Sequence, residues 1–305
     1  MKSEKNLILT ALDFSKCSDN ALNYALKSYN DYNAKIIFLH AIQSGYIETN
    51  IEKLVDKDPK ITKHNIENKL QTIISKKIKK YKSKCDYEII TEFSLPLDLI
   101  LKTLHKVKPF FILLGSKKTI SFVQNFFKND TIKIIEQAKC PVIVIPEGVH
   151  YKKIQRITFA TNYNGSDIIS IQNLAEQANR FKVELLVLHI SDGELTIDFE
   201  LAMLNDFKNK VSKVTSYKNI AYKLIEGSDF DDIIKQELIP KKTDLFALSA
   251  SLHHTWFSNL IENRITKILQ QSKVPVMAYH YKGEKDNLYL TKLKDERTLQ
   301  YSISN

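Results

Sequence analysis

The segment AKCPVIVI at residues 138–145 decides the fold, because the chain carries a second version of it, SKVPVMAY, at residues 272–279. At the same shift of 134 residues, FILLGS at 111–116 falls on LFALSA at 245–250. Agreement in the same order at separate places is the signature of an internal repeat. We therefore expect one structural unit to occur twice in the chain.

The start of the unit repeats with a longer shift. IIFLH at residues 36–40 matches LLVLH at 185–189, which is a shift of 149 residues. The first copy must therefore hold roughly 15 extra residues, the difference between the two shifts. We place them within Gly45–Tyr81, between the second and third strands of the first copy.

Within each copy, short apolar and β-branched runs alternate with segments of helical spacing. The runs are typical of buried parallel strands, and the segments between them of crossover helices. The expected strands are Asn6–Leu12, Lys35–Ala41, Tyr87–Glu92, Phe110–Leu114 and Pro141–Ile145, then Arg156–Thr161, Glu184–His189, Ala221–Ile225, Leu245–Leu248 and Pro275–Tyr279. The expected helices of the first copy are Asn20–Tyr29, with Ser15 or Ser18 as its N-cap, Asn65–Tyr81, Pro96–His105 and Thr131–Gln137. Because parallel strands joined by right-handed crossovers place helices on both faces, this pattern predicts an α/β protein with two tandem, doubly wound, Rossmann-like sheets of five parallel strands.

The domain boundaries follow from the repeat. We expect a first domain at residues 1–148, a linker at Glu147–Lys153, a second domain at 154–281 and a charged tail at 282–305. The tail can pack locally, remain disordered or dock on a domain, and the sequence leaves these three open.

Composition sets the class of protein. A hydrophobic share of 43% with 26% charged residues is ordinary for a globular domain. We expect no signal peptide and no membrane helix, because the start is interrupted by polar residues and no apolar run approaches ~20 residues. The three cysteines are widely spaced and indicate neither a disulfide framework nor a zinc site; we expect Cys140 to be buried at a strand start. These features favour a reduced, cytoplasmic protein.

Positive charge gathers in one run. The net charge is +10, and six lysines lie between Lys76 and Lys84. Such a run can contact phosphate backbones, but it is also typical of the solvated end of an amphipathic helix. Nucleic-acid readers usually interleave arginine and aromatic residues, and here only Tyr81 intervenes, so we favour the solvated helix end.

The opening strand ends in LILTALDFS at residues 7–15, the second strand ends in His40, and the closing strand is introduced by KCPV at 139–142. In this order the segments resemble a universal stress protein domain, over nearly all of residues 4–146 and 154–280. The resemblance implies a sheet of strand order 3-2-1-4-5 in each copy. It also implies a pseudo-dimer in which the closing strands Val142–Ile145 and Val276–Tyr279 lie edge to edge, and in some members ATP binding.

The ATP-binding members of the family carry Gly-x2-Gly-x9-Gly-Ser/Thr after the fourth strand. Glycines let the backbone approach phosphate oxygens, and the final Gly-Ser opens a helix whose free N–H groups attract negative charge. In the first copy the motif begins with Gly115 and Ser116, but Lys118 replaces the next glycine and Lys128-Asn129 replaces Gly-Ser. The positive charge of these lysines attracts phosphate. Their side chains, however, occupy the space that a glycine would leave open for it. Asn129 to Thr131 can alternatively cap the following helix.

The second copy departs further from the motif. Its glycine positions hold Ser249, Leu252 and Glu262, and Asn263 replaces the final serine. A carboxylate at Glu262 would repel phosphate, so we expect no ATP there.

The adenine end of the motif is better preserved in the first copy. Asp13 matches the family's acidic residue beside the nucleotide, and its counterpart in the second copy is Asn162. Asp13 can instead cap the helix that follows it. Ala41 occupies the position of a backbone contact to adenine. The candidate nucleotide site is therefore made of Asp13, Ala41, Gly115, Ser116, Lys118, Lys128 and Asn129, with ATP or AMP confined to the first domain.

No catalytic constellation and no metal site emerge from the sequence. His40 and His189 end apolar strands and are expected to be packed side chains. The cluster His253-His254-Thr255-Trp256 fits a loop that crosses the ligand crevice. We therefore expect no enzyme but a tandem universal stress protein in a stress-response regulatory or scaffold role, without strong ATP binding and without a resident cofactor. An adenine-nucleotide sensor that uses only the first domain, and a basic nucleic-acid-associated protein, are the alternatives. Its partners are expected to be an unidentified protein and, optionally, a second copy of the chain.

Overall fold

The structure is a computed structural model of the chain, and it describes most of it. The described residues are 6–32, 34–43, 54–116, 126–191, 193, 195–227, 230–250 and 258–280; among them, the side chains of 30–32, 126–129, 230–231 and 258–264 are not described.

Strands and helices alternate through both halves of the chain, as expected. The first half contains β1 (Asn6–Ala11), α1 (Lys16–Tyr32), β2 (Ala34–Ile42), α2 (Pro59–Tyr81), β3 (Asp86–Phe93), α3 (Pro96–Lys106), β4 (Phe111–Ser116), α4 (Phe126–Gln137) and β5 (Val142–Pro146). The second contains β6 (Arg156–Ala160), α5 (Gly165–Phe181), β7 (Glu184–Ser191), α6 (Ile197–Val214), β8 (Ile220–Glu226), α7 (Phe230–Glu237), β9 (Leu245–Ser249), α8 (Ser258–Gln271) and β10 (Val276–Tyr279). All ten expected strands occur, with ends that differ by a residue or two.

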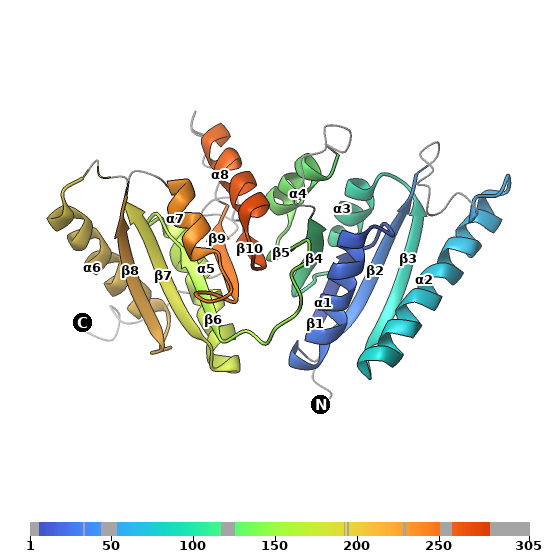
Figure 1. Cartoon of the computed structure of the whole chain (residues 1–305), viewed down its shortest axis with the longest axis horizontal. Helices are drawn as coiled ribbons and strands as arrows, with labels where there is room; N and C mark the ends of the chain where they lie inside the picture. The colour runs from blue at the N-terminus through green and yellow to red at the C-terminus, as the bar shows by residue number, and fades with distance from the viewer. Residues whose placement is uncertain are drawn as a thin grey trace, which may run out of the picture.

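The ten strands form one continuous sheet in the order β3-β2-β1-β4-β5-β10-β9-β6-β7-β8. Each half by itself has the order 3-2-1-4-5, so the α/β fold class is confirmed. The halves meet where β5 and β10 pair antiparallel, with Ile143 opposite Met277, while the other strand pairs are parallel. In Figure 1 the sheet crosses the whole molecule, with α2 and α6 at its two ends and α4 beside α8 over the junction.

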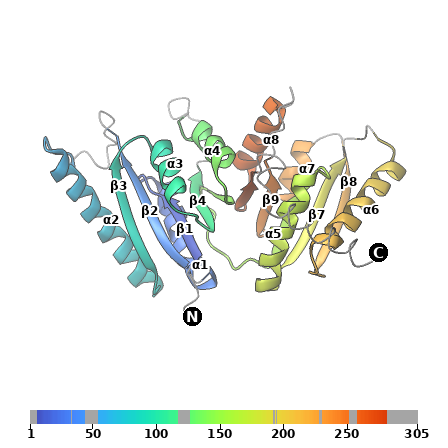
Figure 2. The ribbon, with the colours of Figure 1, turned by 180° about the vertical axis from the view of Figure 1, so that it is seen from behind.

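Each face of the sheet has its own core. Because strand side chains alternate between faces, Ile8 and Phe38 point into one core and Leu9 and Ile37 into the other. The first core is completed by residues of α1, α2, α5 and α6, and the second by residues of α3, α4, α7 and α8. Figure 2 shows the molecule from behind, with α3 and α4 in front of β4. This division puts α1 and α2 side by side on one face, which matters for the pocket described below.

Three helices begin earlier than the sequence predicts, and the first of them, α1, begins at Lys16 rather than Asn20. α2 begins at Pro59 rather than Asn65, because the Asp58 carboxylate accepts a hydrogen bond from the Lys60 N–H and proline is favoured in the first turn. α4 is already helical at Phe126, so Asn129 to Thr131 lie inside the helix. The expectation that they cap it is wrong, since a cap must stand before the first helical residue.

The linker between the halves is tied to both of them. The Asn20 side-chain amide of α1 donates to the carbonyl oxygens of Pro146 (3.2 Å) and Val149 (2.8 Å). At the other end, the Lys152 ammonium lies 2.7 Å from the Asp244 carboxylate, which precedes β9. The linker therefore contacts α1 directly and is not a free tether.

Candidate functional site

The carboxyl ends of β1, β2 and β4 bring four of the predicted site residues to one edge of the sheet. These strands are neighbours in the order β2-β1-β4, and Asp13, Ala41, Gly115 and Ser116 lie at or just after their ends. Strand order reverses between β1 and β4, which is where ligands of open α/β sheets bind. We call this edge of the first half the crest.

The other predicted residues cannot be placed as side chains. Lys118 lies outside the described residues, and Lys128 and Asn129 are on α4 with side chains that are not described. In the second half, residues 251–257, which include His253, His254 and Trp256, and the tail at 282–305 also lie outside them, as do the side chains of Glu262 and Asn263.

Asp13 takes part in the turn that leads into α1. Its Oδ1 accepts a hydrogen bond from the Ser15 N–H at 2.9 Å, and its own N–H donates to Ser18 Oγ at 3.2 Å. The cap of the helix is Ser15, whose Oγ accepts from the Ser18 N–H at 3.1 Å. Asp13 therefore stabilises the turn before the helix. Of the two N-cap residues that the sequence allowed, Ser15 and Ser18, Ser15 is the cap.

Gly115 has a structural reason to be glycine. A Cβ added at this position would lie 2.2 Å from the Cys17 carbonyl oxygen and 3.0 Å from the Ser18 nitrogen. The first turn of α1 thus packs directly on the β4 backbone, an approach that only a residue without a side chain permits. The one glycine of the motif that survives is accounted for by packing alone.

Ala41 and Ser116 are held by their strands. Ala41 of β2 lies opposite Glu92 of β3, and it is partly buried against the core on the α3 side. Ser116 is opposite Pro146 of β5, and its carbonyl accepts a hydrogen bond from the Glu147 N–H at 2.8 Å. Neither side chain is fully buried.

In the second half a carboxylate occupies the corresponding helix N-terminus. Asp167 Oδ2 accepts hydrogen bonds from Thr161 Oγ1 (2.8 Å), the Asn162 N–H (3.0 Å) and the Asn164 N–H (3.3 Å). Its side chain is buried, which raises its pKa, while these hydrogen bonds oppose the shift. The first half has Ser18 at this position. A second anion is unfavourable at a helix start whose N–H groups already bind a carboxylate.

This residue was missed from the sequence, although a signal existed. Asn164 and Asp167 have the spacing of a capping box, and the structure shows the hydrogen bond from the Asn164 N–H to the Asp167 carboxylate.

Two histidines lie two residues before the ends of β2 and β7, in equivalent positions; His40 is buried and His189 is partly buried, so both are packed side chains as expected. His40 Nδ1 lies 2.7 Å from the Leu12 carbonyl oxygen, and His189 Nδ1 lies 2.8 Å from that of Thr161. The carbonyl oxygen needs a donor, so Nδ1 carries a proton in both rings. Burial lowers the pKa of His40.

Their surroundings differ. His189 Nε2 lies 3.3 Å from the buried Glu200 carboxylate, whereas His40 Nε2 is buried with no hydrogen-bond partner among the described residues.

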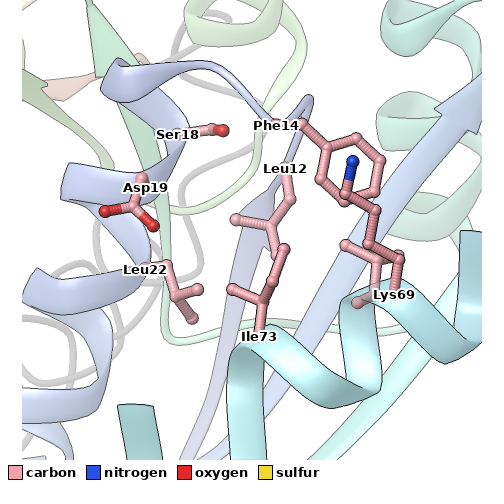
Figure 3. Close-up of a pocket in the computed structure, with 8 residues that line it drawn as sticks. Leu12, Phe14, Ser18, Asp19, Leu22, Lys69 and Ile73 are labelled. Atoms are coloured by element: carbon pink, nitrogen blue, oxygen red, sulfur yellow. The ribbon is translucent and has the colours of Figure 1, made fainter. Parts of the chain in front are cut away.

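A pocket of about 270 Å³ lies between α1 and α2, beside the crest. Figure 3 shows how α1 and α2 form its two sides, with Phe14 at the end of β1 and Lys69 reaching over it. The Lys69 ammonium is 4.7 Å from the centre of the Phe14 ring. We call this space the α1–α2 pocket; it is lined by Leu12, Phe14, Ser18, Asp19, Leu22, Lys69, Leu70 and Ile73.

Phe14 is held in an unusual backbone conformation. Its φ is +61°, which is rare for a bulky residue, and Tyr163 at the matching place of the second half has the same value. Such conformations cost free energy and persist where the surrounding structure imposes them. Both halves therefore hold an aromatic ring beside the histidine, at 4.8 Å between ring centres for Phe14 and His40 and 4.2 Å for Tyr163 and His189.

The lysine run on α2 does not form one uniform surface. Lys77 is only 17% exposed and pairs with both oxygens of Asp19, at 2.8 and 2.9 Å. Lys76, Lys79 and Lys80 are exposed near the helix C-terminus, where positive charge is favourable. One lysine of the run thus serves to join α2 to α1.

The cysteines show no sign of reactive chemistry. None of the three forms a disulfide; Cys17 is buried, and Cys85 and Cys140 are partly exposed. The expectation that Cys140 is buried is therefore wrong, because it lies in the turn before β5, where it stays partly exposed. Burial nevertheless raises the pKa of the Cys140 thiol to about 12, and a protonated thiol is a poor nucleophile.

The described part of the chain contains no group of three or more histidine, cysteine or acidic side chains able to hold a metal ion. It also contains no helix of the length and apolar character needed to cross a bilayer.

Comparison with known proteins agrees with this geometry. The sequence model of the universal stress protein family matches residues 6–146. Among solved structures, a universal stress protein from Archaeoglobus fulgidus is 15% identical, with 91% of this chain and 97% of that chain covered at a TM-score of 0.65. A putative universal stress protein from Pseudomonas aeruginosa is 12% identical, with 91% and 94% covered at 0.56.

The cytoplasmic domain of a prokaryotic cation chloride cotransporter also shares the fold, at 8% identity, with 90% and 95% covered and a TM-score of 0.51. At these identities the structural likeness concerns the fold, which serves more than one function. No curated protein matches the chain. The match to the family model rests on the sequence itself, and so over residues 6–146 the chain belongs to the universal stress protein family.

Proposed function

We propose that this protein acts in the stress response as a regulatory or scaffold protein that does not bind ATP strongly. Gly115 is the observation that carries this proposal. It is the one glycine left of the family's phosphate-binding motif, and contact with the Cys17 carbonyl explains it without a nucleotide. In the second half, the Asp167 carboxylate occupies the helix N-terminus and disfavours an anion there.

The rest of the proposal follows from the sequence. No catalytic motif is present, so we assign no enzyme activity and no resident cofactor. We place the protein in the cytoplasm and expect it to act through an unidentified protein partner, with its two halves serving as the pseudo-dimer and a further dimer of chains as an option. The antiparallel pairing of β5 with β10 supports the pseudo-dimer.

An adenine-nucleotide sensor in the first half is the second candidate. It is favoured by the arrangement of β1, β2 and β4, which brings Asp13, Ala41 and Gly115 to one edge of the sheet. ATP or AMP would lie there, with Asp13 beside the adenine or ribose. Nucleic-acid binding by the lysine run is less favoured, because Lys77 is already paired with Asp19.

Isothermal titration of the full chain with ATP, ADP and AMP distinguishes the first two candidates. We expect no binding in the micromolar range. Micromolar binding that Asp13→Ala abolishes, and that the matched variant Asn162→Ala in the second half leaves intact, would overturn the proposal in favour of the sensor.

A further inference from the structure

The first turn of α6 is attached to the sheet by a carboxylate rather than by apolar side chains. Of residues 197–202, Glu200 is buried and the others are exposed, among them Ile197 and Phe199. The next buried residue of the helix is Leu204, one turn further along. A surface helix usually attaches through apolar residues on its inner face. The attachment of this turn therefore depends on what the Glu200 carboxylate contacts.

Glu200 contacts two side chains near the end of β7. Its Oε1 accepts a hydrogen bond from Ser191 Oγ at 2.8 Å, and its Oε2 lies 3.3 Å from His189 Nε2. Ser191 Oγ also accepts a hydrogen bond from the Gly193 N–H at 3.2 Å, within the connection that leads to α6. The Glu200 Oε2 atom is buried and accepts no hydrogen bond among the described residues. The His189 ring is therefore placed to stabilise the negative charge on this oxygen.

The surroundings of His189 favour a positive charge on its ring. Helix α6 contributes the Glu200 carboxylate, and α5 contributes Asp167, whose pKa is raised by burial while attraction to His189 opposes that shift. The Tyr163 ring stacks on His189, and burial raises the pKa of its hydroxyl, which stays uncharged. On the sheet, β8 places the apolar Leu224 opposite His189. The ionisable groups that face the ring are thus acids, and nearby carboxylates favour the charged form of histidine.

The contact between His189 and Glu200 needs a proton. Nδ1 of His189 already donates to the Thr161 carbonyl oxygen, so a second proton, on Nε2, makes the ring an imidazolium that faces the carboxylate. Without that proton, a lone pair on Nε2 faces the carboxylate oxygen in the interior. A buried charge without a compensating partner is costly. The buried position of Glu200 therefore depends on this one proton.

The first half does not repeat this contact. His40 is the counterpart of His189, and its Nε2 has no hydrogen-bond partner among the described residues. Burial lowers the pKa of His40. The shift of 149 residues that relates the two histidines places Ile42 at the position of Ser191. The contact of a histidine with a carboxylate is therefore not a requirement of the fold.

We propose that His189 and Glu200 form a pH-sensitive latch on the first turn of α6. The turn is docked while His189 Nε2 carries its proton, and it is released when that proton is lost as the pH rises. This inference concerns regulation and goes beyond the proposed function. Because α6 lies at one end of the sheet (Figure 1) and its first turn carries Ile197 and Phe199, release presents a mobile apolar segment at that end of the molecule.

Hydrogen exchange of the full chain between about pH 5.5 and about pH 9.5 tests the latch, because this range brackets the ~6.5 at which an unperturbed histidine titrates. The amides to follow are those of residues 200–204, which include the hydrogen bond from the Glu200 N–H to the Thr196 carbonyl oxygen. Their exchange is compared with that of an unstructured peptide at each pH. We expect this ratio to rise about tenfold across the range, the size expected for losing a contact with a charged group. The amides of residues 62–66, in the first turns of α2, should show no such rise.

Glu200→Gln is the decisive variant, because glutamine keeps the size of the side chain and an acceptor for Ser191 but carries no charge. We expect the exchange ratio of residues 200–204 to be independent of pH in this variant. The matched control is Asp198→Asn, which removes an exposed carboxylate from the same turn and should keep the pH dependence of the unchanged chain. Equal pH dependence in Glu200→Gln and in the unchanged chain overturns the proposal.

Nitrogen-15 NMR of the imidazole rings detects the proton directly and uses the unchanged chain. The His189 signals are assigned by their loss in the variant His189→Gln. We expect His189 Nε2 to lose its proton over the pH range in which the exchange of α6 rises. A rise in exchange without deprotonation of Nε2, or deprotonation of Nε2 without a rise in exchange, shows that the proposed latch is wrong.

Discussion

Replacing Gly115 with alanine should destabilise the first half strongly. The added Cβ would lie 2.2 Å from the Cys17 carbonyl oxygen, whereas ordinary contacts begin at 3.4 Å. The first turn of α1 would have to move away from β4 by about 1 Å, the difference between these distances. Because the clash is with backbone, no side-chain rotation relieves it, and the helix also carries Ala21, Leu22 and Ala25 in the core. We expect a loss near the upper end of the overpacking range, about 3 kcal/mol.

Urea unfolding followed by circular dichroism measures this loss, and a thermal scan should show a midpoint lower by ~6–12 °C for a unit of this size. The matched control is Gly165→Ala at the start of α5, where an added Cβ meets no atom within 4 Å. That change should leave stability equal or raise it by about 0.5–1 kcal/mol, because it restricts the unfolded chain. If Gly115→Ala unfolds at the same urea concentration as the unchanged protein, the packing explanation of this glycine is refuted.

Further predictions concern the linker and the helix ends. Burial raises the pKa of Asp244, but the hydrogen bonds from the Lys152 ammonium and from two backbone N–H groups outweigh it and lower the pKa overall. The carboxylate therefore stabilises the fold above its unfolded pKa of ~3.9, and that stability is lost as the pH falls through the lower folded pKa. Asp244→Asn should cost about 1–3 kcal/mol in urea unfolding at about pH 7 and much less at about pH 3; an equal cost at both would contradict the pairing. Asn20→Ala should remove the clamp on the linker at Val149, and faster protease cleavage within 147–153 is the expected readout; an unchanged cleavage rate would argue against the clamp. Lys182 ends α5 with φ +54°, so Lys182→Gly should raise the urea midpoint modestly, by about 0.5–1 kcal/mol in stability, and a lower midpoint would show that the lysine side chain matters there.

Much of the fold was predictable from the sequence. The ten strands were found because a buried strand is a short apolar run whatever surrounds it, and the repeat was found because the two copies share the order of those runs. The pairing of β5 with β10 followed from the family resemblance and agrees with the structure. The helix starts were less accurate, since Asp58-Pro59 was overlooked as a cap and the start of α4 at Phe126 gave no local signal.

The candidate site was only partly predictable. The sequence showed that Asp13 and Gly115 are retained, but the reason for each is a contact. Gly115 meets the carbonyl of Cys17, a residue far away in the chain, and Asp13 meets the turn at Ser15. In the second half, the Asp167 carboxylate occupies the N-terminus of α5. Its capping-box spacing from Asn164 could have revealed this from the sequence.

The sequence by itself determined that this chain repeats one α/β unit, and that residues 6–146 match the universal stress protein family while most of the glycines of its nucleotide motif are replaced. Those properties belong to short segments and to residue identity. Only the tertiary structure decided that Gly115 serves the packing of α1 on β4, that a pocket lies beside Phe14, and that Tyr163 packs against Phe207. Close approach and empty volume depend on how far apart two packed elements lie, and that distance is set by all the side chains between them, not by any one segment.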